Sequence, residues 1–297
     1  FVAEVNGDYE LQYDSFGDFR PVREAALGLW LGVAPRRVLR SPDGAWQRLV
    51  AGTSLDLSLE ADRQLVPGHS GSAPWHLHRF RWGPEVVSGR REIRGVLDLF
   101  RYNRRASFRL RTRLRDRVDA GWSEGMPERL FERTYSGRFH VGGGLDVEPA
   151  FSQGNRSREG NGPFAFDVRE RSLSVRGRAP LRGGWQVGLS AAVGHEAEGV
   201  RTLEVKRYLF APEIIRTLSG RGRVRGSLDW VRVEGAEPIP LFLGMANGNW
   251  VGTNLVWRLS AHYRLMRYLT GQLVYDGRKR PDRPAYHYGR VEMRASF

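Results

Sequence analysis

The sequence predicts an all-β protein: an antiparallel up-and-down transmembrane β-barrel of about fourteen strands, with about twelve to sixteen compatible with the pattern. Three observations lead to this fold class. Apolar and polar residues alternate with a period of two, the alternating runs often reach ten residues, and long polar connections separate some runs while short ones separate others. Together these features are typical of strands that cross a bilayer and are apolar on one side only.

The alternation is clearest between Ala106 and Arg115. Even positions in this segment are mostly apolar, whereas the odd positions are Ser107 followed by four arginines. On a helix these arginines would spread around the circumference, but on a strand they form one charged stripe. The pattern recurs in runs at 49–59, 135–147, 173–179, 185–193, 254–265 and 269–275. We therefore expect strands throughout these runs.

Turn-forming residues separate the runs. We expect longer polar connections at 41–44, 67–74, 154–163, 244–249 and 276–284, and short ones at 182–184 and 266–267. An up-and-down barrel has long loops at one end and short turns at the other. The glycines at 142–144 lack the Lys-Ser/Thr ending of a phosphate loop, so we expect a bend or close packing in a strand there.

Residues 1–297 are predicted to form a single β-barrel domain, for which the length is ample. Residues 1–90 are less regular and contain several prolines, so they are compatible with extra strands, a plug or loop, or the end of a preceding domain. The chain begins at Phe1 without a basic-then-apolar signal segment. This predicts either processing or an origin in a longer chain.

Composition excludes several classes of protein. No apolar run reaches the ~20 residues of a spanning helix, so a helical membrane protein is excluded. The absence of cysteine excludes disulfides and thiolate ligands. The net charge of +14 is carried almost entirely by arginine, which suits lipid phosphates, nucleic acid or an anion-lined pore. Because the arginines recur at alternate strand positions and not in one patch, we predict no nucleic-acid partner.

The last strand has two distinct faces. Its apolar face holds Val291, Met293, Ala295 and Phe297, and Arg290, Glu292 and Arg294 lie on the other. Tyr286 and Tyr288 stand at the far end. Nine steps of ~3.3 Å tilted by ~40° give a height of about 23 Å, close to the ~25 Å apolar band of a membrane barrel. We predict an aromatic girdle formed by Tyr286, Tyr288 and Phe297.

This ending resembles the carboxy-terminal signature of bacterial outer-membrane β-barrel proteins, in which a terminal Phe follows hydrophobic residues at alternate positions. The likeness covers about ten residues and reaches only the superfamily level. It implies that Val291, Met293, Ala295 and Phe297 are recognised by the barrel-assembly machinery. It also implies a location in the bacterial outer membrane, contact with the lipids of that membrane, and room for additional envelope subunits as partners.

The arginines on the polar faces are the candidate functional residues. In a barrel they would line the lumen: Arg109, Arg111, Arg113, Arg176, Arg178, Arg223, Arg225, Arg258, Arg264, Arg290 and Arg294. One hypothesis is passive transport through an anion-favouring pore. The other is a structural or anchoring barrel, including the carboxy-terminal domain of a larger surface or secretion protein. In that barrel the arginines pair with acids such as Asp98, Glu204, Asp229 and Glu292.

No enzymatic activity is predicted, and neither catalytic residues nor a cofactor can be assigned. The stretch 68–72 has serine and histidine but lacks the second glycine of a nucleophile elbow, which leaves a barrel-rim hydrolase as a weak alternative. His76 and His78 share a strand face, but no acidic cluster completes a metal site, so no metal is predicted. A soluble β-sandwich binding module is the other alternative, because sandwich strands also alternate.

Overall fold

The computed structural model describes residues 23–37, 44–65, 86–119, 127–160, 164–219, 221–236 and 239–295. These residues form one antiparallel sheet of thirteen strands, each hydrogen-bonded to its neighbours in chain order. The strands are β1 (Arg23–Val33), β2 (Ser54–Leu65), β3 (Val86–Leu99), β4 (Ala106–Asp119), β5 (Glu128–Val141), β6 (Leu145–Arg158), β7 (Phe166–Pro180), β8 (Trp185–Glu198), β9 (Leu203–Leu218), β10 (Gly222–Gly235), β11 (Gly252–Met266), β12 (Leu269–Lys279) and β13 (Tyr286–Ala295).

The helical elements are short and lie in the connections. They are η1 (Pro35–Arg37), α1 (Ala45–Ala51), η3 (Gly142–Gly144), η4 (Arg182–Gly184), η5 (Leu241–Leu243) and η6 (Met245–Gly248). None of the described helices has the length and apolar character needed to cross a membrane. The all-β antiparallel fold predicted from the alternation is therefore confirmed.

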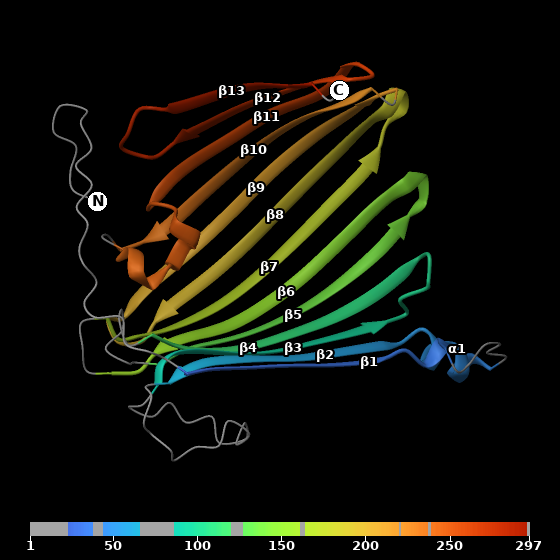
Figure 1. Cartoon of the computed structure of the whole chain (residues 1–297). Coiled ribbons are helices and arrows are strands. Elements are labelled where there is room, and N and C mark those ends of the chain that lie inside the picture. Colours follow the sequence, from blue (N-terminus) through green and yellow to red (C-terminus); the bar gives the residue numbers. More distant parts are fainter. Residues whose placement is uncertain are drawn as a thin grey trace.

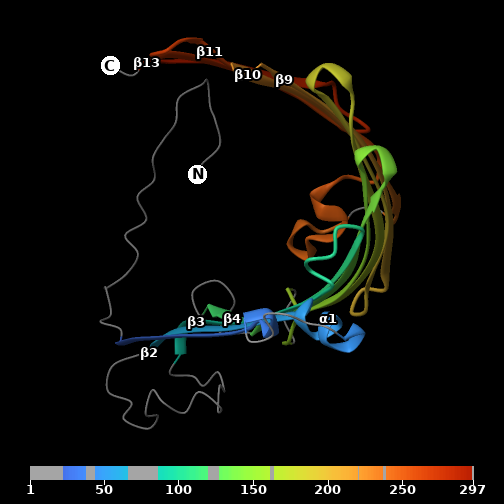
Figure 2. The ribbon, with the colours of Figure 1, turned by 90° about the vertical axis from the view of Figure 1, so that its right-hand side faces the viewer.

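The sheet curves into an open arc and is not closed into a barrel (Figures 1 and 2). Within the described residues β1 and β13 are its two edges. Successive strands alternate in direction, so the first and thirteenth run the same way and could pair directly only in parallel. Such a pair would interrupt the antiparallel pattern. Because the strands form one sheet, the alternative of a two-layered sandwich is wrong for this part of the chain.

The expected strand at 135–147 is two strands. The chain reverses at η3, where Gly143 and Gly144 have φ values of 80° and 81°. Only glycine adopts this left-handed conformation at little cost, so the glycines end β5 and start the hairpin to β6. The alternating pattern continues across the turn, which is why the sequence alone concealed it. The short connection expected at 182–184 is confirmed as η4.

The expected run at 49–59 is also divided. Residues 49–51 belong to the helix α1, and strand β2 begins only at Ser54. The helix contains good helix formers in its sequence AWQRLVA, and the Gln47 side chain accepts a hydrogen bond from the Gly44 N–H at 3.2 Å. Two alternating apolar residues were too few to distinguish this helical turn from a strand.

Connections of different length gather at opposite ends of the sheet. The end that we call the short-turn end has the connections 100–105, 142–144, 181–184, 219–221 and 267–268. The long-loop end has 66–85, 120–127, 159–165, 199–202, 236–251 and 280–285. The predicted separation is thus confirmed for most connections but not for all, because 199–202 at the long-loop end is shorter than 100–105 at the short-turn end. The β1–β2 connection, which contains α1 and the predicted turn at 41–44, is long but lies at the short-turn end, and the predicted 67–74 loop lies outside the described residues.

The two faces of the sheet differ in chemistry. Residues paired across strands share a face, and the register joins apolar positions into continuous rows such as Leu29, Leu59 and Ile93. The opposite face carries the arginines and carboxylates. It is the concave face, because the connection with η5 and η6 folds onto it inside the arc (Figure 2). The apolar rows therefore occupy the convex face.

The convex apolar residues are exposed along the whole sheet. Large apolar side chains with substantial exposure occur there on every strand from β1 to β13, including Leu31, Phe108, Leu189 and Val291. On β8 the convex positions from Trp185 to Val193 are all apolar. Eight steps of ~3.3 Å give about 26 Å along the strand, or about 20 Å of height at a tilt of ~40°. Soluble proteins rarely expose an apolar surface of this extent.

Candidate functional site

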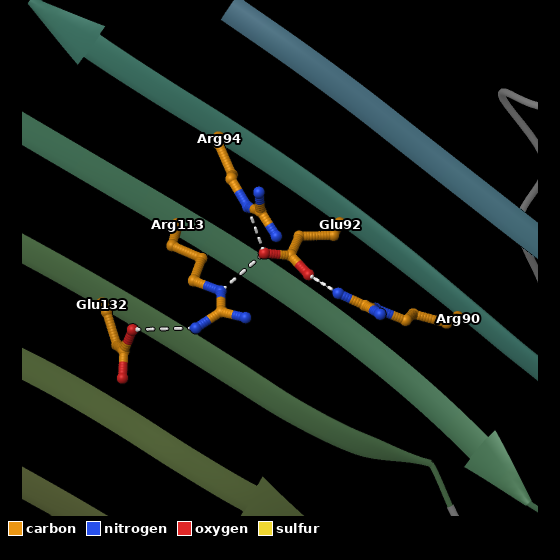
Figure 3. Close-up of polar contacts among 5 residues, drawn as sticks. All are labelled: Arg90, Glu92, Arg94, Arg113 and Glu132. Carbon is orange, nitrogen blue, oxygen red and sulfur yellow. Dashed lines mark hydrogen bonds and ion pairs between the residues drawn. The ribbon is translucent and has the colours of Figure 1, made fainter. Parts of the chain in front are cut away.

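The most connected group on the concave face is centred on Glu92 of β3 (Figure 3). One carboxylate oxygen accepts hydrogen bonds from the Nε groups of Arg94 and Arg113, the latter at 2.7 Å, and the other oxygen accepts one from Arg90. Arg113 also reaches Glu132 of β5 at 3.8 Å. Glu92 is 1% exposed, so its charge would be costly without these three guanidinium groups.

The β-strand geometry creates this cluster. Arg90, Glu92 and Arg94 alternate along β3 and therefore share one face. The register places Arg113 beside Arg94 and one diagonal position from Glu92, and it aligns Arg113 with Glu132 on the next strand. The three arginines keep between 32% and 46% exposure, so the carboxylate is shielded while the guanidinium groups still contact water.

Similar ion pairs recur along the concave face. Arg109 donates its Nε to Asp98 at 2.6 Å, and the Ser54 hydroxyl lies 3.5 Å from the same carboxylate. Other concave pairs join neighbouring strands, alternate positions of one strand or, for Arg207–Glu170, strands β9 and β7 across β8: Arg138–Glu148, Arg158–Glu128, Arg207–Glu170, Arg225–Glu213, Arg258–Asp276, Arg290–Glu292 and Arg294–Glu292. The concave face is therefore a network of opposite charges and not a uniformly cationic surface.

All eleven arginines predicted for the polar face lie on the concave face, as the cross-strand register shows. Arg109, Arg113, Arg225, Arg258, Arg290 and Arg294 form ion pairs. Arg176 donates to the Ser190 hydroxyl at 3.3 Å, and Arg264 also lies on this face. Arg111, Arg178 and Arg223 have no hydrogen-bond or ion-pair partner within the described part of the chain.

The four acids expected as partners behave differently. Asp98 and Glu292 pair with concave arginines, and Asp229 lies on the concave face without an ion pair among the described residues. Glu204 is a wrong assignment, because the register aligns it with Ala197 on the convex face. It lies 3.9 Å from His195. Glu204 is the second residue of β9, and the pairing of β8 with β9 assigns its face.

An inward loop, residues 239–250, covers part of the concave face near the long-loop end. Leu243, Met245 and Ala246 are buried against Phe166, Val168, Val205, Val231 and Val233. The Ala246 N–H donates to both oxygens of the buried Glu196, at 3.1 and 2.9 Å. Arg156 donates to the Leu243 carbonyl. An apolar contact and two polar anchors therefore hold this loop against β6, β7, β8, β9 and β10.

The backbone of the inward loop adopts an uncommon conformation. Ala246 and Asn247 have φ values of 56° and 52°, in the left-handed region that non-glycine residues rarely occupy. Asn249 stabilises the turn by donating its side-chain amide to the Ala246 carbonyl at 2.9 Å. Strained residues persist only where surrounding contacts hold them, so Glu196 and Asn249 define a built feature and not a passive connection.

The carboxy-terminal residues are divided between the two faces. Val291, Met293 and Ala295 lie on the convex apolar face, paired with Leu273, Gly271 and Leu269 of β12. Tyr286 and Tyr288 pair with Arg278 and Asp276 and therefore lie on the concave face with Arg290. Phe297 lies outside the described residues. Aromatic residues that do occupy the convex face in this region are Trp257 and Tyr275, with His287 stacked beside Tyr275.

The remaining candidates from the sequence are the serine- and histidine-containing stretch and the individual histidines. The stretch 68–72, His76 and His78 lie outside the described residues. Among the residues that the structure does describe, no group of three or more His, Asp or Glu side chains is arranged to hold a metal ion. His262 lies on the concave face opposite Arg223 and Gln272.

Sequence reasoning missed the charges of the convex face. Its described cations are Arg63, Arg91, Arg129, Arg133, Arg169, Arg171, Lys206, Arg216, Arg232 and Lys279. Its acids are only Asp116, Asp167, Glu204 and Glu234. All of these cations except Arg216 lie towards the long-loop end, beyond the apolar positions. The sequence did contain a signal for these charges, because Arg169 and Arg171 occupy the same alternate positions as Leu173 and therefore lie on the same face.

The comparisons with known proteins add no assignment to this geometry. No model of a protein family matches the chain, and no curated protein is found to be similar in sequence. The functional inference therefore depends on the chemistry of the two faces.

Proposed function

We propose that the protein is a bacterial outer-membrane β-barrel with a structural or anchoring role. The observation that carries this proposal is the inverted chemistry of the sheet: exposed apolar residues cover the convex face, and charged residues lie on the concave face. A membrane barrel has this arrangement, with an apolar band towards lipid and a polar interior. The alternation of short and long connections and the convex positions of Val291, Met293 and Ala295 also support it.

The concave network favours an anchoring barrel over an anion-selective pore. Selective anion pores need rings of uncompensated positive charge. On this face most arginines have carboxylates as neighbours, and the Glu92 cluster links two adjacent strands through a single acid. Such pairs resist separation of the strands because breaking them would leave shielded charge without a partner. The inward loop adds a further obstruction inside the arc.

Cysteine labelling tests the membrane orientation directly, because the chain has no native cysteine. Single cysteines are placed at Val187, Leu189 and Ala191 on the convex face of β8 and at Gly188, Ser190 and Ala192 on its concave face. In protein folded in lipid vesicles, a charged maleimide is expected to label the concave set and spare the convex set. Equal labelling of both sets, or a stable soluble monomer without detergent, would contradict the proposal.

Passive transport is the second candidate, and one observation favours it. Arg111, Arg178 and Arg223 have no acidic partner in the described part of the chain, so the concave face keeps some uncompensated cations. Conductance in planar bilayers separates the two functions. An anchoring barrel should give no resolved anion-selective steps, whereas a pore should give steps whose selectivity falls when these arginines become glutamine.

A further inference from the structure

We propose that the convex face binds the phosphorylated headgroup of a membrane lipid at a row of cationic side chains, with an acyl chain in the apolar hollow beside it. The inference rests on the proposed function, because it requires lipid at this face. The evidence is the position, pairing and neighbours of five residues on β5 to β9, strands that follow one another in the arc (Figure 1).

The cationic row is defined by the cross-strand register. Arg133 pairs with Gln153, Gln153 with Arg171, Arg171 with His195, and His195 with Lys206. All five side chains therefore lie on one line across the convex face. Adjacent strands are ~4.8 Å apart, so the row is about 19 Å long. Each member is an N–H donor, and the row contains no carboxylate.

Arg133, Arg171 and Lys206 lack acidic partners among the described residues, whereas His195 lies 3.9 Å from Glu204 on the same face. Within the described residues, Arg171 and Lys206 make no ion pair or hydrogen bond. Arg133 makes no ion pair there either; its guanidinium lies 5.2 Å from the centre of the Phe131 ring and 3.5 Å from the Tyr135 hydroxyl. On the concave face of the same strands, Arg138, Arg158 and Arg207 pair with carboxylates, which Arg133, Arg171 and Lys206 do not. Guanidinium and ammonium groups of this kind bind phosphate oxygens well.

The next row towards the middle of the sheet is apolar or aromatic. Register joins Tyr135, Phe151, Leu173, Val193 and Tyr208. Leu173 and Val193 are 58% and 52% exposed, although both would be costly to leave in water. The cationic row thus lies at the border where the apolar surface ends. Lipid headgroups meet their acyl chains at the same kind of border.

A shallow apolar hollow starts at this border and extends away from the cations. Its lining includes Leu173, Phe151, Tyr135, Pro149, Gly137 and Phe108. Gly137 has no side chain, and the Phe139 ring lies 2.8 Å from the position that its Cβ would take, so the hollow is lined by aromatic carbon there. A phosphate at the cationic row would leave its acyl chain over this hollow. The combination specifies an anionic lipid and distinguishes this site from cations that lie alone at the rim.

The test compares the pair Arg171→Gln/Lys206→Gln with the pair Arg216→Gln/Lys279→Gln, whose cations lie on the convex face outside the row. Each folded protein in detergent is titrated with phosphatidic acid, with phosphatidylcholine of the same chains, and with inorganic phosphate. Native mass spectrometry counts the bound molecules. Each Lys or Arg near an anionic lipid contributes about fivefold, so the first pair should weaken phosphatidic acid binding about 30-fold. The second pair should bind as the unmodified protein does.

Two results would overturn the inference. The first is equal affinity of both variants for phosphatidic acid. The second is displacement of phosphatidic acid by inorganic phosphate at matching concentration, which would indicate a site for free phosphate and not for lipid. Either result leaves the period-two cysteine labelling of β8 intact, so a failure of the lipid site is distinguishable from a failure of the membrane orientation.

Discussion

Replacing Val175 by arginine separates a lipid-facing from a water-facing convex surface. Val175 is 44% exposed and pairs with Pro149 and Ala191, so its side chain lies among apolar neighbours on the convex face. In water, a substitution at such an exposed position changes stability by no more than about 0.5 kcal/mol. If the position faces the middle of a bilayer, the arginine lowers the free energy of unfolding by about 2–4 kcal/mol. This corresponds to about 30-fold to 1,000-fold in the ratio of folded to unfolded protein.

Ser174→Arg is the matched control. Ser174 precedes Val175 on the same strand but lies on the concave face between Ala150 and Ala192. There the same side chain lies on the concave face, which does not contact lipid in the proposed orientation, so the free energy of unfolding should change by less than about 0.5 kcal/mol. Reversible urea unfolding in lipid vesicles measures both variants. Equal stabilities for Val175→Arg and Ser174→Arg would refute the assignment of the convex face to lipid.

Three further substitutions test particular contacts. Glu92→Gln removes the negative charge shared by Arg90, Arg94 and Arg113. Because these arginines still contact water, we expect the free energy of unfolding to fall by about 1–3 kcal/mol in the same assay. An unchanged unfolding midpoint would argue against the cluster. Glu196→Ala removes the acceptor for the Ala246 N–H, so proteolysis within the inward loop should accelerate, and Glu196→Gln, which keeps a carbonyl oxygen, should change it less. Gly277→Ala forces a methyl group against the Trp257 ring and should cost about 1–3 kcal/mol, whereas Gly289→Ala meets no atom within 4 Å and should be nearly neutral.

Period-two alternation predicted the strands because it is a local property. From Ala106 to Arg115 each residue's face follows from its neighbours along the chain, and the structure adds only the extension to Asp119. Turns were predictable where they interrupted the pattern, as at 182–184. The turn at Gly143 and Gly144 was not predictable, because these glycines continue the alternating pattern of the flanking strands.

Features that depend on pairing between strands could not be read from the sequence. Glu92 accepts hydrogen bonds from two strands because the β3–β4 register brings Arg113, twenty-one residues later in the chain, beside it. The same applies to Glu196 and Ala246, which lie fifty residues apart. The predicted aromatic girdle considered only the distance of Tyr286 and Tyr288 along the strand. It ignored that both tyrosines alternate in phase with Arg290 and therefore share its face. Parity along the strand was sufficient to assign their face.

The shared direction of β1 and β13 constrains how this sheet can be completed. Copies inserted in one orientation in a membrane are related by rotation about its normal, so facing edges of two such sheets would also run in the same direction. Antiparallel bridging of the two edges therefore requires an odd number of intervening strands, whichever polypeptide supplies them. One strand inserted between the two edges would keep every strand pair antiparallel, whereas an inserted two-stranded hairpin would leave one parallel pair.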